Sequence, residues 1–337
     1  MKVGVLTNTL RDRSFNEALE VLAGIGYEMI TVGVGGHENL DDDHGNAKRL
    51  LSDPQMFKDF EAAIKRNNLE LSTLNCPGNP IHPQKKIAQQ MDEDMRNCVL
   101  LAEKLGLDRI STFSGCPGDS ENALYPNWVT YYWPHEFDHV REWQWNEVAI
   151  PYWKDLCAFA KKHGVTKIGM EIHPNQLVYN TDTLLRMREA VGEEIGLCLD
   201  VSHLFWRGMD PVVVIEAFAG CIWQFHAKDV ITWEHRVKRD GVIDARIGRA
   251  PDRTHNFCIP GAGHDMQTWK AIARALRLAG YDRDMCFEHE DRMMGQMEGL
   301  ERAYDFLKDV VQSVPIEECG MYWKAAVTAE KTKFINE

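Results

Sequence analysis

The sequence of 337 residues lacks the features that mark several classes of protein. No apolar run approaches the ~18–20 residues needed to cross a bilayer, so we do not expect a membrane protein. The first residues lack the long apolar segment of a secretory signal peptide, and we therefore expect a cytoplasmic protein. Nine cysteines are scattered along the chain without a CxxC pair. This pattern favours buried free thiols in a reducing compartment over disulfides.

Positive charge is also scarce. Lysine and arginine number 38 against 51 aspartates and glutamates, which gives a net charge of −13. Proteins that bind nucleic acid need cations to displace the counterions of the phosphates, so we expect no nucleic-acid partner. The sequence also holds no basic cluster for a phosphate group, which disfavours a phosphosugar substrate. The 44% of hydrophobic and 26% of charged residues are ordinary for a globular protein.

Short apolar runs alternate with stretches of helical spacing along most of the chain. The runs predicted to form strands are 2–9, 28–34, 69–74, 109–113, 167–172, 195–199, 222–227 and 284–287. The stretches predicted to form helices are 15–24, 56–66, 84–105, 147–163, 181–191, 211–219, 266–279 and 297–311. Strand–helix units in this number predict a (β/α)8 TIM barrel. An open doubly wound sheet is the alternative, but no glycine-rich phosphate motif follows the first strand.

We expect a single barrel domain over residues 1–312 and a C-terminal extension over 313–337. Three long connections, 35–53, 114–146 and 229–264, follow strands on the face where barrels carry their active sites. Five of the ten tryptophans lie between positions 128 and 153. Aromatic rings there, Trp128 among them, suit the apolar face of a sugar or a flat aromatic group. A hydrophobic plug or a subunit contact is the alternative.

Carboxylates or imidazoles stand at the ends of the last four predicted strands. Glu171, Asp200, His226 and Glu288 follow one another at this position from strand to strand. Because barrel strands end at one rim, we expect these side chains to lie close together. Converging carboxylates repel each other unless a cation neutralises them. The four donors predict one divalent ion, Mn²⁺ first, with Mg²⁺, Co²⁺, Fe²⁺ and Zn²⁺ as alternatives.

Two alternatives to this site remain open. Glu290 could replace Glu288, although Glu288 directly follows the strand. The carboxylates could instead belong to a salt-bridge network. Its partners would be Arg246, Arg249 or Arg253.

The strand-end motifs resemble those of the sugar phosphate isomerase/epimerase superfamily, the xylose-isomerase-like TIM barrels. The motifs are DVSHLFWRGMDP (200–211), FHAKD (225–229), PGAGHD (260–265) and FEHED (287–291), and the likeness covers about residues 1–312. The four proposed ligands fall where that superfamily binds its metal. Within it, SGCPGD (114–119), NWVTYYWP (127–134) and the SHLFW segment resemble the catalytic α subunits of bacterial C-glycoside deglycosidases. That resemblance implies a 3-oxo-glycoside substrate and a small β subunit as partner.

The chemistry expected of such a site is proton abstraction next to a carbonyl. His173 is the first choice of base, because it lies two residues after Glu171 and points to the same side of the strand. The alternative for His173 is that it supports a metal-binding residue or binds the substrate. His203 could bind a sugar oxygen or act as an acid. Further substrate contacts are expected from Lys228, Asp229 and His264.

Enolisation can lead to different products. Expulsion of an aglycone makes the protein a lyase, and the aromatic connection at 114–146 favours this reading. Reprotonation makes it a keto-sugar isomerase or epimerase, in which the superfamily usually employs two metal-binding glutamates as bases, here Glu171 and Glu288. A DNA repair endonuclease and a non-enzymatic sugar-binding barrel are more distant readings. The apolar residues of the aromatic connection and the tail predict a small β subunit or a second copy of the chain as partner.

Overall fold

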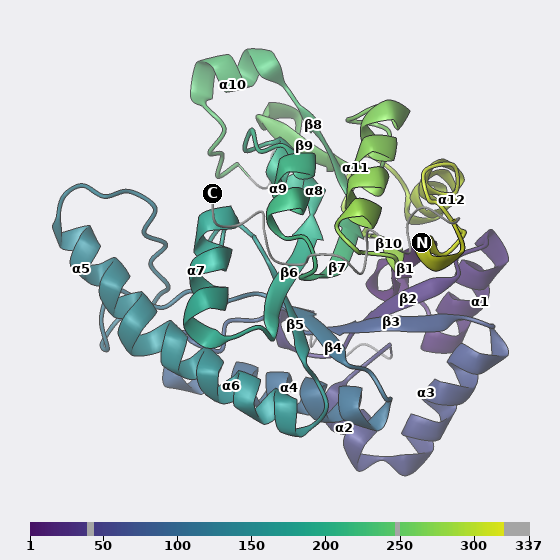
Figure 1. The fold of residues 1–337 in the computed structure, drawn as a ribbon, viewed down its shortest axis with the longest axis horizontal. Helices are drawn as coiled ribbons and strands as arrows, with labels where there is room; N and C mark the ends of the chain where they lie inside the picture. Colours follow the sequence, from purple (N-terminus) through teal and green to yellow (C-terminus); the bar gives the residue numbers. More distant parts are fainter. Residues whose placement is uncertain (39–43, 247–249, 320–337) are drawn as a thin grey trace.

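The computed structural model describes residues 1–38, 44–246 and 250–319, and eight parallel strands close into a barrel at the centre (Figure 1). The strands are β1 (Lys2–Leu6), β2 (Met29–Gly33), β3 (Glu70–Asn75), β4 (Arg109–Thr112), β5 (Lys167–Glu171), β6 (Ile195–Asp200), β7 (Ile222–Ala227) and β10 (Asp284–Phe287). Each pairs with the barrel strands before and after it, and β10 pairs with β1. The closure confirms the predicted TIM barrel and excludes the open sheet.

Strand register brings the candidate residues to one rim of the barrel. Glu171 is the last residue of β5. Asp200, the last residue of β6, lies directly beside His226 of β7. Phe287 ends β10, so Glu288 is the first residue beyond it. The four positions therefore follow one another around the carboxyl end of the barrel, as the sequence predicted.

Helices surround the barrel. The eight predicted helices are confirmed, with shifts at their ends: α1 (Phe15–Ile25), α3 (Pro54–Arg66), α4 (Lys85–Lys104), α6 (Ile150–Lys162), α7 (Thr181–Val191), α9 (Pro211–Ala217), α11 (Met266–Leu278) and α12 (Gln296–Leu307). Side-chain caps begin several of them, such as Ser14 at α1 and Asn180 at α7. The inward faces bury large side chains, among them Trp269 and Leu276 of α11. Burying a side chain of that size stabilises the fold by ~1.5–3 kcal/mol.

The connection predicted over 229–264 holds structure that sequence analysis missed. It contains β8 (Asp229–Thr232) and β9 (His255–Cys258), which pair antiparallel, and helix α10 (Glu234–Asp240) between them. Only Lys228 separates β7 from β8, where the sequence predicted one strand, 222–227, followed by a long connection. This hairpin rises beside the rim of the barrel (Figure 1).

The other two long connections also contain helices. Helix α2 (Ala47–Ser52) and the short turn η2 (Gly36–Glu38) follow β2, while residues 39–43, which include three aspartates, lie outside the described part of the chain. The connection after β4 ends in α5 (Glu136–Trp143) and a π-helical turn, η3 (Gln144–Ala149), which runs into α6. A short helix after β6, α8 (Val201–Phe205), was likewise not predicted.

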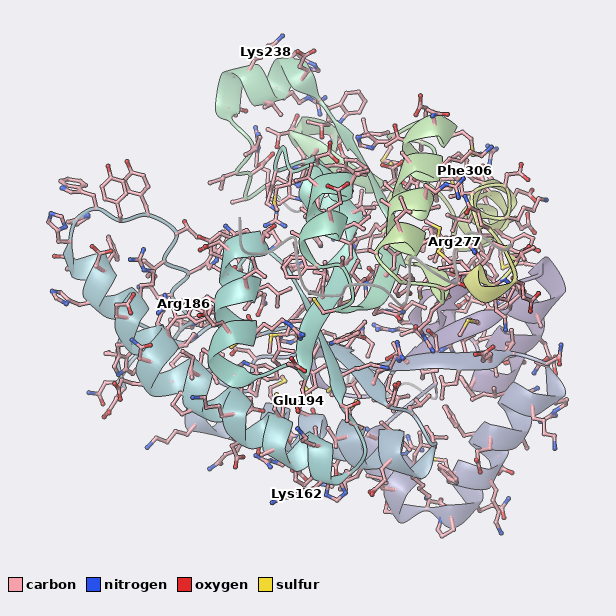
Figure 2. The ribbon with its side chains drawn as sticks, in the orientation of Figure 1. Lys162, Arg186, Glu194, Lys238, Arg277 and Phe306 are labelled. Atoms are coloured by element: carbon pink, nitrogen blue, oxygen red, sulfur yellow. The ribbon has the colours of Figure 1, made fainter. Side chains whose placement is uncertain are left out.

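Two polar side chains anchor the connection after β4. The Gln144 amide donates to the backbone carbonyls of Gly118, at 2.9 Å, and Asn127, at 2.7 Å. Arg186 of α7, labelled in Figure 2, places its guanidinium 4.4 Å from the centre of the Trp145 ring. These contacts hold the ends of the aromatic connection on the barrel.

No helix in the described residues is long and apolar enough to cross a membrane. All nine cysteines are free thiols, as the scattered spacing predicted. Eight are buried, and Cys319 is exposed. Most of the tail, residues 320–337, lies outside the described part of the chain.

Candidate metal centre

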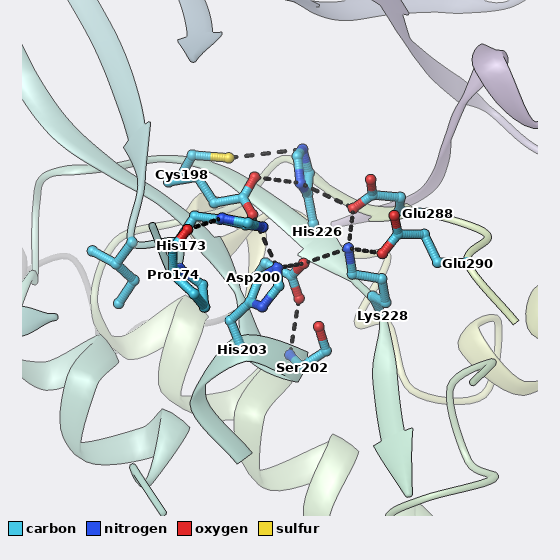
Figure 3. Close-up of polar contacts among 12 residues, drawn as sticks. His173, Pro174, Cys198, Asp200, Ser202, His203, His226, Lys228, Glu288 and Glu290 are labelled. Atoms are coloured by element: carbon cyan, nitrogen blue, oxygen red, sulfur yellow. Dashed lines mark hydrogen bonds and ion pairs between the residues drawn. The ribbon is translucent and has the colours of Figure 1, made fainter. Parts of the chain in front are cut away.

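The four predicted metal-binding residues lie at the carboxyl end of the barrel in two groups that share His226: Glu171 with Cys198 and His226, and Asp200 with His226 and Glu288 (Figure 3). His226 is central among them. Its Nδ1 lies 3.5 Å from Glu171 Oε2 and 3.6 Å from Glu288 Oε2. Asp200, His226 and Glu288 can present ligand atoms that all lie within 4.8 Å of one another.

These separations suit ligands of one ion better than hydrogen bonds. A hydrogen bond between nitrogen and oxygen is usually 2.7–3.2 Å long. Two atoms that each lie about 2.1 Å from one ion are roughly 3.0–3.4 Å apart in tetrahedral or octahedral geometry. Within the described chain, Nδ1 of His226 and Oδ2 of Asp200 are buried without a hydrogen bond, although Oδ2 forms an ion pair with Lys228. Polar atoms buried in this way are expected to have a partner, and a divalent ion would satisfy both.

Lys228 supplies the cation that the carboxylates contact. Its Nζ lies 2.9 Å from Asp200 Oδ2, 2.9 Å from Glu288 Oε2 and 2.8 Å from Glu290 Oε2. One ammonium charge faces four carboxylates once Glu171 is included. The surplus of negative charge leaves room for a divalent cation.

Two of the three arginines predicted as salt-bridge partners of these carboxylates, Arg246 and Arg253, contact other residues. Arg246 pairs with Asp244, at 2.7 Å, and with Asp240, at 3.0 Å, and so serves the hairpin. The Nη2 atom of Arg253 lies 3.3 Å from His255 Nε2. Arg249 lies outside the described residues.

The acidity of the carboxyl groups reflects their crowding. Burial would raise the pKa of Glu171, but the contacts with His226 outweigh it and hold the pKa at about 2. Burial raises the pKa of Asp200 and raises that of Glu288 to about 7. Deprotonated Asp200 and Glu288 thus carry a free-energy cost that bound positive charge would lower.

Cys198 orients the histidine of this cluster. It lies two residues before Asp200, on the same face of β6, and its Sγ is 3.7 Å from His226 Nε2. This contact occupies Nε2 and leaves Nδ1 turned toward Glu171 and Glu288. Sequence analysis missed Cys198, although the alternation of side chains along β6 contains the signal.

His173 lies beside the metal-binding cluster with one ring nitrogen fixed. Its Nδ1 is 2.6 Å from the backbone carbonyl of Pro174. A carbonyl only accepts hydrogen bonds, so Nδ1 carries the proton in neutral His173 and Nε2 carries the lone pair. The ring packs against His203, with ring centres 4.3 Å apart, and against Phe113, at 4.7 Å. A lone pair held in place is what a general base requires.

His203 lies deeper, between two carboxylates. Its Nε2 is 3.5 Å from Glu171 Oε1 and 3.5 Å from Asp200 Oδ2. Burial and the positive charges nearby lower the pKa of His203 well below its ordinary value, so the ring is neutral at pH 7. A neutral ring suits a hydrogen bond to a sugar oxygen better than proton donation.

Three further residues shape this region and were missed. Phe257 of β9 lies beside the cluster, with its ring centre 5.0 Å from Lys228 Nζ and 5.2 Å from the His203 ring. Phe113 borders His173. Such apolar walls exclude water and strengthen the charge interactions. Arg207 donates to the backbone carbonyls of Ile172, Tyr179 and His203 and thereby joins the connections after β5 and β6.

Asp229 and His264 lie together, away from the carboxylates. The buried Asp229 accepts hydrogen bonds from the backbone N–H groups of Gly261, Gly263 and His264, and its Oδ1 is 2.7 Å from His264 Nδ1. His264 stacks on Phe205 and lines a hollow of about 540 Å³ between α9 and α11. This geometry makes Asp229 an anchor for the 260–265 turn.

Trp128, the remaining predicted substrate contact, packs on the connection after β5. Its ring meets that of Tyr179 edge to face, with centres 5.4 Å apart. The carbonyl of Tyr179 accepts from Arg207, which also binds the His203 carbonyl. Trp128 therefore lies beside the rim and has no described contact with the metal-binding residues.

The comparisons with known proteins agree with the fold. A relative from Bacillus subtilis (strain 168), Uncharacterized protein YfiH, is 33% identical over 314 residues, which cover 92% of this chain and 99% of that protein. Among solved structures, the probable 3-DHS dehydratase AsbF of Bacillus anthracis has a TM-score of 0.61 at 17% identity. The match covers 91% of this chain and 99% of that one.

Two further structures resemble the chain in fold. D-psicose 3-epimerase of Clostridium cellulolyticum H10, solved with D-tagatose, has a TM-score of 0.57 at 16% identity over 92% of this chain and 98% of that one. A xylose isomerase-like TIM barrel protein of Mycobacterium smegmatis, solved with magnesium, has a TM-score of 0.61 at 13% identity. The match covers 93% of this chain and 98% of that one. The family model described as xylose isomerase-like TIM barrel matches residues 19–310. The chain thus belongs to the xylose isomerase-like TIM barrel family.

Proposed function

We propose that the protein is a divalent-metal-dependent lyase that acts on 3-oxo-glycosides, as a C-glycoside deglycosidase α subunit does. One observation carries the proposal. A cluster of carboxylates and His226 lies next to a histidine whose Nε2 lone pair is fixed by the carbonyl of Pro174. Removal of a proton next to a carbonyl requires a cation site and a positioned base close to each other.

Glu171, Asp200, His226 and Glu288 would hold the ion. When bound, it would supply the positive charge that stabilises an enediolate as it develops. Mn²⁺ is our first choice, because oxygen donors with one imidazole suit it, and Mg²⁺, Co²⁺, Fe²⁺ and Zn²⁺ are compatible. The magnesium in the Mycobacterium smegmatis relative of this fold supports a divalent ion in general.

The proton moves to His173 in this proposal. In a 3-oxo-glucoside, Nε2 of His173 takes the proton from C2, and the electron pair of that C–H bond forms a double bond to C1. The bond from C1 to the aglycone breaks, and its electron pair leaves with the aglycone. His203 donates a hydrogen bond to a sugar oxygen, and the rings of Phe113 and Phe257 exclude water.

Two observations support elimination over epimerisation. The first is the fixed lone pair of His173, which supplies the one base that elimination needs, whereas epimerisation needs a base on each face of the sugar. The second is the name of the Bacillus anthracis structure, a probable dehydratase, since dehydration is an elimination. Trp128 and the aromatic connection would border the aglycone.

A metal-dependent keto-sugar isomerase or epimerase is the alternative. Glu171 and Glu288 each have a carboxylate oxygen near His226 Nδ1, at 3.5 and 3.6 Å, and could serve as the two bases. The epimerase among the structures of similar fold supports this reading.

One incubation separates the two functions. We expect Mn²⁺-loaded protein to release the aglycone from a 3-oxo-glucoside and to leave free ketohexoses unchanged. Product analysis by mass spectrometry and NMR measures both reactions. Epimerised ketohexose together with intact 3-oxo-glucoside would favour the alternative.

We also propose that another polypeptide covers the aromatic connection, either a small β subunit or a second copy of the chain. Tyr125, Tyr131, Tyr132 and Trp133 are each at least 60% exposed, which is unusual for neighbouring aromatic residues of a monomer. Light scattering after size exclusion should therefore show a dimer, or a complex when the neighbouring small gene product is co-expressed. A stable, active monomer under both conditions would contradict this expectation.

A further inference from the structure

Lys228 is a buried ammonium group surrounded by three carboxylates, and it donates hydrogen bonds to Glu288 and Glu290. Its Nζ lies within 2.9 Å of oxygens of Asp200, Glu288 and Glu290, and its side chain is 3% exposed. An ammonium group has three N–H donors and no acceptor. Two of these carboxylates accept hydrogen bonds from Lys228, and the third, Asp200, forms an ion pair with it (Figure 3).

Two of these carboxylates are also proposed ligands of the divalent ion. The Glu288 oxygen that Lys228 contacts, Oε2, is the one 3.6 Å from His226 Nδ1. Asp200 Oδ1 accepts from the Ser202 backbone N–H at 2.9 Å, so Oδ2 is the oxygen left for a cation. A divalent ion and an ammonium group that share these two oxygens would lie a few Å apart and repel each other. The two cations therefore compete.

We propose that Lys228 is a tethered cation that holds Asp200 and Glu288 in the metal-free protein, yields them to the divalent ion, and remains paired with Glu290. This inference rests on the metal site of the proposed function. Glu290 is placed for the role, because its side chain is 46% exposed against 18% for Glu288 and so lies farther out. Of the three groups of described residues that could hold an ion, one contains Glu288 and none contains Glu290.

The exchange has a consequence for substrate binding. Once Asp200 and Glu288 bind the ion, two N–H donors of Lys228 become available to oxygen atoms of a substrate. Lys228 then acquires the substrate contact that the sequence predicts for it, and only in the metal-loaded protein. Metal and substrate thus bind in a coupled order, metal first.

Metal titration of charge variants tests the exchange. Lys228→Met removes the competing charge at similar length, so we expect it to bind Mn²⁺ at least about tenfold more tightly than the unaltered protein. Damage to the fold would weaken binding, so the direction of the change is diagnostic. Lys228→Gln, also neutral but able to donate hydrogen bonds to the carboxylates, should tighten binding too. It is the second measurement if Lys228→Met does not fold. Lys238→Met, on the exposed helix α10 (Figure 2), is the matched control and should bind as the unaltered protein does.

Glu290→Gln completes a double-mutant cycle. It should weaken Mn²⁺ binding severalfold, because Lys228 loses the partner that draws it from Asp200 and Glu288. The same change should have little effect when Lys228 is already methionine. The exchange would be overturned if Glu290→Gln had equal effects in both backgrounds. It would also be overturned if Lys228→Met and Lys228→Gln both left Mn²⁺ binding unchanged or weakened it. Either result would leave the assignment of the metal site intact. An unaltered protein that binds no Mn²⁺, Mg²⁺, Co²⁺, Fe²⁺ or Zn²⁺ would overturn both.

Discussion

Replacing Asp200 with asparagine is expected to remove most of the bound metal and all measurable turnover. The substitution keeps an Oδ1 that can accept from the Ser202 backbone N–H, as Asp200 does at 2.9 Å, so the start of α8 is preserved. It replaces Oδ2, the oxygen that faces Lys228 Nζ and the metal site, with an amide N–H₂ group. An amide nitrogen has no lone pair to offer a cation, and the site also loses one negative charge.

The loss of metal affinity should be at least about 100-fold, since even residues that only support a ligand often contribute 10–100-fold. Metal content after dialysis, measured by plasma mass spectrometry, and Mn²⁺ titration quantify it. Asp210→Asn is the control, because Asp210 caps α9 at the surface and asparagine caps equally well. Full metal occupancy with normal turnover in Asp200→Asn would refute the assignment of this centre.

The barrel and the order of its strand ends could be predicted from sequence, because both follow from local patterns. A strand such as β6 is recognisable from its apolar residues, and closure of the barrel places its last residue, Asp200, beside the next strand. The ion-pair partners of Lys228 could not be predicted in this way. Its three partners lie on β6 and beyond β10, and sequence spacing does not show how a long flexible side chain chooses among them.

The hairpin after β7 was missed for a different reason. β8 and β9 are four residues each and pair across 22 intervening residues, so neither has the length or the tight turn that predicts a hairpin. The omission hid Phe257, whose position beside Lys228 and His203 depends on that pairing.

The high tryptophan content of the aromatic connection is visible in the sequence, but the direction of each ring is not. Trp145 is buried under Arg186 while Trp133 is exposed.

Replacing His173 with alanine is expected to leave the metal in place and to slow proton removal. His173 is not one of the four proposed ligands, and its ring contacts are with Phe113 and His203. Its Nε2 carries the lone pair because Nδ1 donates to the Pro174 carbonyl at 2.6 Å. Loss of a general base typically slows a reaction by ~10²–10⁴-fold. Exchange with deuterium from D₂O at the carbon beside the carbonyl, followed by NMR, measures this step apart from product release.

The controls for this prediction separate a base from a structural residue. His235→Ala, on the exposed helix α10, should exchange as the unaltered protein does. His203→Ala should weaken substrate binding more than it slows exchange, because a buried neutral ring acts here as a hydrogen-bond donor. Unchanged Mn²⁺ affinity in His173→Ala would show that the rate loss does not come from the metal. A loss below tenfold would assign the base to His203 or to a glutamate. A glutamate base at Glu171 or Glu288 would favour the epimerase, which needs two bases.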